Sequence, residues 1–223
     1  PANTRPWKFP TSCPACKEQL ERTEGEAATF CNNYECPRQI RGRIEHFVSR
    51  GAMDIEGFGE QRVDLFVSEG LINDVSDIFR IDFERISEME GFGELSVANL
   101  KNAIEEARSM DLGRLLFGLR IPHVGTTVAQ LISENFQDLE VLKKVQMQDL
   151  EVIDGLGPKI AMSVFEWFTN ERNVDLILRL QYLGVNPKSE SPLLDDQDKT
   201  LLGMTIVVTG RLQGLSREEA RKI

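Results

Sequence analysis

All four cysteines of the chain lie in two close pairs near its beginning. Cys13 and Cys16 are separated by two residues, fourteen residues follow, and Cys31 and Cys36 are separated by four. Two such pairs, each in a tight turn and joined by a hairpin, provide the four thiolates that a tetrahedral Zn²⁺ binds. Because thiolates are soft ligands and no histidine is adjacent, the spacing predicts one closed structural zinc site without an open catalytic position.

The cysteines also allow other interpretations. An even number permits two disulfides, but nothing in the sequence indicates the secreted setting in which disulfides persist. Four unpaired buried thiols would not need this clustering. His46 follows Cys36 by ten residues and could compete as a ligand, although we expect an ordinary packed or exposed histidine. Structural zinc is typically worth about 10–16 kcal/mol, so the metal would supply most of the stability of so small a module.

A glycine-containing segment recurs four times in the middle of the chain, and its closing glycines are 34, 32 and 32 residues apart. The copies are Ile55-Glu-Gly-Phe-Gly59, Met89-Glu-Gly-Phe-Gly93, Ile121-Pro-His-Val-Gly125 and Ile153-Asp-Gly-Leu-Gly157. Apolar residues follow each closing glycine at offsets of four and seven, which is one face of a helix. The preceding segments, such as 141–145, also show a helical pattern. The repeated unit is therefore predicted to be helix, glycine turn, helix.

Such a unit can bind phosphate through its main chain. Glycines allow a positive φ and a close approach, and the following helix begins with unpaired N–H groups at the positive end of its dipole. The fourth copy suits an anion best, with Gly155, Gly157 and Lys159, and the third offers Thr126 and Thr127. In the third copy Pro122-His123 replaces the first glycine, so that copy could serve packing or place His123 toward solvent or DNA, and we expect packing. Glutamates follow the first two turns and would repel phosphate if they pointed inward. We therefore expect these two turns to make weaker phosphate contacts or to rely on the backbone alone.

The charge of the chain is uneven. The total is −10, with 26 basic and 36 acidic side chains, and most of the acidic excess lies in residues 51–190. An acidic balance is unusual for a protein that binds nucleic acid, but helix N-termini provide positive potential locally. The one basic cluster comprises Arg38, Arg41, Arg43 and Arg50, for which a solvated face and a phosphate contact remain equally open.

Composition also suggests domain limits. Residues 1–12 are expected to be the tail of an upstream domain, 186–200 a polar linker, and 201–223 a strand and part of a helix from a truncated domain. The chain opens at Pro1, so we expect an internal piece of a longer protein. No apolar window is long enough to span a membrane, and without a signal sequence the cytoplasm is expected.

The repeat resembles helix–hairpin–helix domains, which bind the DNA backbone regardless of sequence. With a four-cysteine module before it, the chain resembles the C-terminal portion of bacterial NAD-dependent DNA ligases. The run from His46 to Gly59, the entry from Trp7 to Cys16 and the segment from Leu202 to Gly210 carry this resemblance. It implies a mainly α fold: an OB-domain tail at 1–12, a zinc finger at 13–45, a four-repeat helix–hairpin–helix domain at 46–185 and the start of a BRCT domain at 201–223.

The resemblance further implies a parent enzyme that seals nicks with NAD⁺ and Mg²⁺ bound to upstream domains. The family's adenylated lysine lies in a Lys-x-Asp-Gly motif, and Val152-Ile-Asp-Gly155 lacks that lysine, so this piece should have no chemistry of its own. The expected partner is nicked duplex DNA of any sequence, bound by a monomer. The expected DNA-binding residues are Gly57, Gly59, Gly91, Gly93, Gly125, Thr126, Thr127, Gly155, Gly157, Lys159, Arg38, Arg41 and Arg43.

Two other functions remain open at this point. The same hairpins could form a structure-specific DNA-repair module or a nuclease-associated binding module. Alternatively, they could form a helical array that binds proteins and no DNA.

Overall fold

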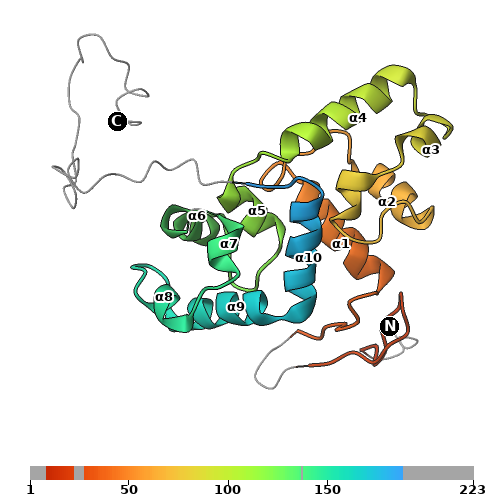
Figure 1. The fold of residues 1–223 in the computed structure, drawn as a ribbon. Coiled ribbons are helices and arrows are strands. Elements are labelled where there is room, and N and C mark those ends of the chain that lie inside the picture. The colour runs from red at the N-terminus through yellow and green to blue at the C-terminus, as the bar shows by residue number, and fades with distance from the viewer. Residues whose placement is uncertain (1–8, 23–27, 137, 188–223) are drawn as a thin grey trace, which may run out of the picture. The chain divides into compact units, whose positions relative to one another are not determined.

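The computed structural model describes residues 9–22, 28–136 and 138–187 (Figure 1). The chain divides into a unit Pro1–Ser191 and a unit Pro192–Ile223, and the second lies wholly outside the described residues. The expected BRCT start at 201–223, most of the expected linker and most of the expected N-terminal tail are likewise outside them. The described part of the chain is mainly helical and contains two isolated β-bridges in place of a sheet, so the expected fold class is confirmed.

The described elements follow one another in a single series (Figure 1). They are α1 (Pro37–Val48), α2 (Glu60–Ser68), the 3₁₀ turn η1 (Asp77–Arg80), α3 (Phe83–Ser87), α4 (Glu94–Ala107), α5 (Leu112–Gly118), α6 (Thr126–Asn135), α7 (Leu139–Leu142), α8 (Met147–Glu151), α9 (Pro158–Thr169) and α10 (Glu171–Tyr182).

Four packed helix pairs correspond to the four repeats: α1 with α2, α3 with α4, α5 with α6, and α8 with α9. Helix α5 also packs on α1, and α10 packs on α9, so the pairs share one hydrophobic core. The apolar residues that follow each closing glycine by seven positions are all buried: Phe66, Leu100, Ile132 and Val164. The predicted helical face is therefore the face that forms the core.

Each repeat turns in the same way, including the one whose sequence differs. Gly57, Gly91 and Gly155 have φ values of 93°, 89° and 90°, and His123 takes the corresponding position with φ 65°. Positive φ at the third residue of a β-turn favours glycine, whereas proline at the second residue presets the turn. Pro122 precedes His123 in this way, so the third hairpin keeps the geometry of the others without its first glycine.

Two expectations about helices need correction or refinement. The expectation of a helix over 141–145 is wrong after residue 142, where α7 ends. There the N–H of Lys144 donates to the carbonyl of Val141 at 3.0 Å, which forms a tighter turn than an α-helix. The helix directly before the fourth hairpin is α8. Helix α1 runs through the expected boundary between residues 45 and 46, so it joins the cysteine module to the first hairpin.

Candidate zinc centre and DNA interface

The two cysteine pairs lie in tight turns that a short antiparallel return brings together. In the first turn, the N–H of Lys17 donates to the carbonyl of Cys13 at 2.9 Å, and Lys17 has a left-handed backbone. The return pairs Glu21 with Phe30 through two backbone hydrogen bonds of 2.8 and 2.7 Å. The second turn ends at Cys36, directly before α1 begins. The predicted hairpin between the pairs is therefore present on both sides of residues 23–27.

The four sulfur atoms form one cluster in which all lie within 4.8 Å of one another. The Sγ atoms of Cys13 and Cys36 are 3.9 Å apart, and those of Cys16 and Cys31 are 3.5 Å apart. Sulfurs about 2.3 Å from a tetrahedral Zn²⁺ lie about 3.8 Å from one another. The spacing of the cluster therefore fits zinc, and because the four cysteines are free, the alternative of two disulfides finds no support.

The pKa values of two thiols in the cluster are shifted in opposite directions. Hydrogen bonds from the backbone N–H groups of Cys16 and Ala15 lower the pKa of Cys13 to about 6. The N–H of Asn33 acts to lower the pKa of Cys31, but burial and the three neighbouring thiols raise it to about 12. Four thiolates so close together repel one another unless a divalent cation compensates their charge. A bound Zn²⁺ would hold all four as thiolates and so lock the two turns together.

His46 lies apart from this cluster. Its Nε2 is 2.8 Å from the carbonyl oxygen of Phe117, and its ring packs on the Phe117 ring with centroids 4.6 Å apart. The histidine thus joins α1 to α5, as an ordinary packed residue does, and the interpretation as a competing zinc ligand is not supported.

The helices after the hairpin turns begin differently from α3, α5, α7 and α10. Glycines 59, 93, 125 and 157 are the N-cap residues of α2, α4, α6 and α9, and none of these helices has a capping side chain. In contrast, Asp82, Asp111, Asp138 and Asn170 cap α3, α5, α7 and α10 through side-chain hydrogen bonds. Serine, aspartate and asparagine are the stabilising N-caps, so the hairpin helices leave their first N–H groups to another partner.

Neither backbone conformation nor packing requires glycine at these four N-cap positions. Their φ values lie between −67° and −88°, which any residue adopts, and a Cβ built on each would meet nothing within 4 Å. All four are exposed. A residue that is glycine four times without a conformational or packing reason is typical of a place where another molecule's backbone approaches closely.

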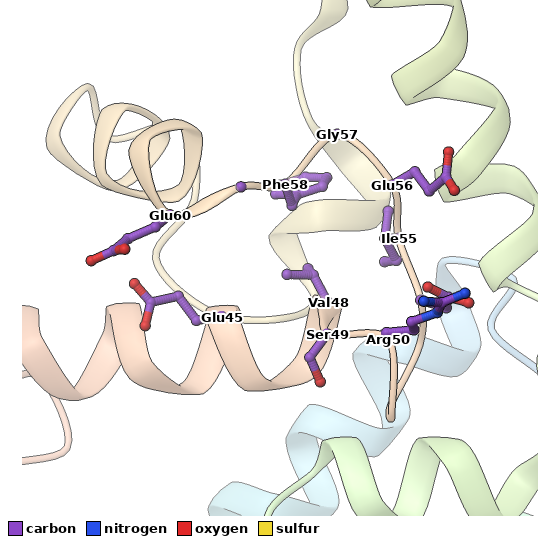
Figure 2. A pocket seen from close by; sticks show the side chains of 11 residues that line it. Glu45, Val48, Ser49, Arg50, Ile55, Glu56, Gly57, Phe58 and Glu60 are labelled. Atoms are coloured by element: carbon purple, nitrogen blue, oxygen red, sulfur yellow. The ribbon is translucent and has the colours of Figure 1, made fainter.

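The first hairpin is acidic. It borders a pocket of about 450 Å³ whose lining includes Glu45, Asp54, Glu56 and Glu60, with Arg50 as its one basic residue. Figure 2 shows Glu45 of α1 and Glu60 at the start of α2 with their carboxylates near one another. Four carboxylates beside one arginine disfavour a phosphate at this turn. The expectation of a weaker contact here agrees with this electrostatic environment.

The third and fourth hairpins present more favourable groups. Thr126 and Thr127 are exposed at the first turn of α6, and Lys159 is exposed at the first turn of α9. Pro158 occupies the first position of α9, which suits proline because that N–H has no partner within the helix. The residues expected to face a phosphate therefore do lie at the surface, beside bare helix N-termini.

The basic cluster of α1 is not one surface. Arg38 is exposed, whereas Arg41 forms an ion pair of 2.8 Å with Asp64. Arg43 donates to the carbonyl of Tyr34 at 2.6 Å and stacks on the Tyr34 ring. Arg41 and Arg43 thus have protein partners, and Arg38 is the member of the set best placed for a phosphate contact. Sequence spacing missed Tyr34, which touches Arg43 of α1 and Arg172 of α10, because proximity between distant segments leaves no local pattern.

Two family models match the chain. One, described as the NAD-dependent DNA ligase C4 zinc finger domain, matches residues 12–37 and so covers the four cysteines. The other, described as a helix-hairpin-helix motif, matches residues 114–177 and so covers the third and fourth hairpins. The expected presence of a four-cysteine zinc finger and of helix–hairpin–helix motifs is therefore confirmed, whereas the expected domain limits stay predictions.

The chain is also similar, over almost its whole length, to curated proteins named DNA ligase. It is 48% identical to that of Chloroflexus aurantiacus over 217 residues, which is 97% of this chain and 30% of the relative. It is 44% identical to that of Roseiflexus castenholzii over 97% of this chain and 30% of the relative. It is 41% identical to that of Bacillus subtilis over 96% of this chain and 33% of the relative. The chain spans about a third of the length of these relatives, and the resemblance seen in the sequence is confirmed.

Proposed function

We propose that this chain, whose zinc finger matches that of NAD-dependent DNA ligases, is the DNA-binding C-terminal portion of such a ligase. In the whole enzyme it would hold the duplex around a nick while other domains join the 3′-hydroxyl to the 5′-phosphate in replication and repair. The similarity to DNA ligases along 97% of the chain supports this proposal, and nothing found favours the alternative modules.

The observation that carries the DNA-binding function is the set of uncapped hairpin helices. Each begins at an exposed glycine that the fold does not require, so the helix N–H groups and dipole are open to a phosphate. Contacts of this kind go to the backbone and not to base edges, so they carry no sequence information directly. Such contacts suit an enzyme that must act on nicks in any sequence.

We infer that the hairpins contribute unequally. The third and fourth lie within the region matched by the helix-hairpin-helix family and carry Thr126, Thr127 and Lys159. The first has acidic neighbours, and Glu94 follows the second turn, so these two would hold DNA more weakly through the main chain of Gly57, Gly59, Gly91 and Gly93. The net charge of −10 predicts modest affinity for the chain by itself, with Arg38 and the rest of the parent adding attraction.

The chemistry of the parent would lie elsewhere. Its lysine would receive AMP from NAD⁺ and pass it to the 5′-phosphate, with Mg²⁺ as a further cofactor, and Val152-Ile-Asp-Gly155 has no lysine for that role. Here Cys13, Cys16, Cys31 and Cys36 would hold one structural Zn²⁺ whose task is to fix the finger. No helix in the described part of the chain is long and apolar enough to cross a membrane. We propose that the parent works in the bacterial cytoplasm and that this portion is monomeric.

Titration of the chain with four fluorescent probes tests this function: nicked duplex, intact duplex, a branched junction and single-stranded DNA of one composition. A ligase portion should bind the nicked duplex at least as tightly as the branched junction and more tightly than the single strand. A strong preference for the junction would favour the repair module. Absence of binding to all four at low salt would favour the protein-binding array.

A further inference from the structure

Tyr34 connects the zinc finger to two distant helices through its ring. It lies between Cys31 and Cys36, and the guanidinium carbons of Arg43 in α1 and Arg172 in α10 are 3.8 and 4.3 Å from its ring centroid. Arg43 also donates to the Tyr34 carbonyl. Aromatic faces attract cations, so one tyrosine holds two positive groups at the edge of the helical domain.

A cavity of about 270 Å³ opens beside this ring. Tyr34, Arg43 and Arg120 line it, together with the amides of Gln39 and Asn173, and no carboxylate is among its lining residues. Pro122 also lines it, so the cavity adjoins the third hairpin. Its walls therefore offer hydrogen-bond donors and positive charge without an internal counter-ion.

The two arginines that line this cavity, and Arg172 on the Tyr34 ring beside it, have no carboxylate partner among the described residues. None of Arg43, Arg120 and Arg172 forms an ion pair there. Asp74 acts on Arg43 from a distance, but its carboxylate already accepts hydrogen bonds from Arg179 and Ser76. Arg43 is half-buried, whereas Arg120 and Arg172 are exposed, and like charges held close together repel one another unless an anion joins them.

Arg120 is placed here at a conformational cost. It has a left-handed backbone with φ 54°, a region that glycine occupies without penalty. Its guanidinium makes one long contact, 3.4 Å to the carbonyl of Gly42. The left-handed backbone of Arg120 costs stability, and its single long contact offsets little of that cost. An arginine kept in such a conformation next to a second arginine indicates a ligand that binds its charge.

The titration of Arg43 agrees with this geometry. Burial lowers the pKa of Arg43, and although Tyr34 and Asp74 oppose the shift, the positive charges of Arg120 and Arg172 lower it further. A bound anion would stabilise the charged guanidinium, so it would raise the pKa of Arg43 and oppose the effects of burial, Arg120 and Arg172.

We propose that Arg43 and Arg120, which line the cavity between the zinc finger and the third hairpin, bind a phosphate group of the DNA backbone there, together with Arg172 on the adjoining Tyr34 ring. Guanidinium groups match phosphate oxygens in pairs, which explains arginine at each position. Because Tyr34 lies within the second zinc turn, the metal site also shapes this phosphate site. The inference rests on the proposed function and adds to it a contact outside the hairpin glycines.

The salt dependence of DNA binding tests the proposal on the full chain. Each phosphate contact that is lost should reduce the slope of log K against log salt by about 0.9, so Arg120→Gly and Arg172→Gln should each lower it by roughly that amount. Arg120→Gly should also retain or raise the melting temperature, since glycine relieves the left-handed backbone. The matched control is Arg85→Gln, which removes the same charge from a guanidinium already paired with Glu69 at 3.4 Å, and its slope should not change.

A second measurement separates this site from the proposed function. Inorganic phosphate is titrated while the arginine side-chain NMR signals are observed, and it should shift those of Arg43, Arg120 and Arg172 with saturation. If both arginine variants kept the wild-type salt slope while a hairpin variant such as Gly157→Ala lost DNA affinity, the phosphate site would be overturned. The proposed function would remain intact. Saturable phosphate binding with unchanged DNA slopes would overturn DNA as its source. If the wild-type chain bound no DNA, the proposed function and the DNA source would both fall.

Discussion

One added methyl group should mainly reduce stability at Gly155 and mainly reduce DNA affinity at Gly157, the two glycines of the fourth hairpin. Gly155 has φ 90° and a Cβ there would lie 3.3 Å from Leu131 Cδ2, whereas Gly157 has φ −67° and open space. Gly155→Ala should therefore lower the free energy of unfolding by about 1–2 kcal/mol or more. Gly157→Ala exchanges one weak N-cap for a poorer one, which costs about 0.5–1 kcal/mol. At this chain length that is a few degrees in melting temperature at most, roughly 2–4 °C per kcal/mol.

Relative to the stability that each variant loses, Gly157→Ala should lose more DNA affinity than Gly155→Ala. The methyl group of Gly157→Ala projects where a phosphate would meet the start of α9, and a hydrogen bond to a charged group is worth about 1.5–3 kcal/mol. Losing one such contact weakens binding about 10- to 100-fold. Fluorescence anisotropy with a nicked duplex measures the affinity, and urea denaturation of the same samples measures stability.

A matched cap variant separates these two effects. Asp82 caps α3 by accepting from the N–H groups of Glu84 and Arg85 at 3.0 and 3.1 Å, far along the chain from the fourth hairpin. Asp82→Ala should cost about 0.5–2 kcal/mol of stability, and since it removes a negative charge it should not weaken DNA binding. If Gly157→Ala bound DNA as the wild type does, or destabilised the fold as much as Gly155→Ala, the start of α9 would not be a phosphate contact.

Further predictions concern the metal, the pH dependence and the core. Mass spectrometry of metals should find about one zinc per chain. Chelation should release it, as should acidification because protons compete for the thiolates, and residues 9–22 and 28–36 should then lose their fold. A metal-free chain with a folded finger would contradict the site. Burial acts to raise the pKa of Asp74, but hydrogen bonds from Ser76 and Arg179 outweigh it and hold that pKa below its usual value. The carboxylate is thus more stable as an anion in the folded chain, so its contribution is present at neutral pH and lost as the pH falls through the lowered pKa. Asp74→Asn should cost about 1–3 kcal/mol at pH 7 and progressively less below about pH 4 in thermal melts, and a cost independent of pH would refute the ion pair. Leu116 is fully buried in α5, so Leu116→Ala should cost about 2–5 kcal/mol in urea denaturation, and a loss below 1 kcal/mol would show that the core packs differently.

The features predictable from the sequence are those set by local spacing. The cysteine pairs follow directly from ligand geometry, and the hairpin helices follow from glycines with apolar residues four and seven positions later. Both patterns are repeated or clustered, so chance does not explain them. The third hairpin shows the limit of counting glycines, since His123 adopts the same turn with help from Pro122.

Contacts between distant segments were not predictable in this way. The arginines of α1 look like one basic cluster in the sequence, but helical geometry separates them and Asp64 and Tyr34 engage two of them. Arg120 and Arg172 carry no motif, and they become notable only because the fold places Arg120 in the same cavity as Tyr34 and places Arg172 against the Tyr34 ring. The contrast between glycine and aspartate N-caps was visible in the sequence once the helix starts were known.

The central claim is that the hairpins bind the DNA backbone without reading its sequence. The most direct measurement is the affinity of the zinc-loaded chain for two nicked duplexes of equal length and unrelated sequence, over a range of salt concentrations. Main-chain contacts to the backbone should give equal affinities within about twofold for the two duplexes, and both affinities should fall together as salt rises. Undetectable binding at low salt, or an affinity that depends strongly on base sequence, would contradict it.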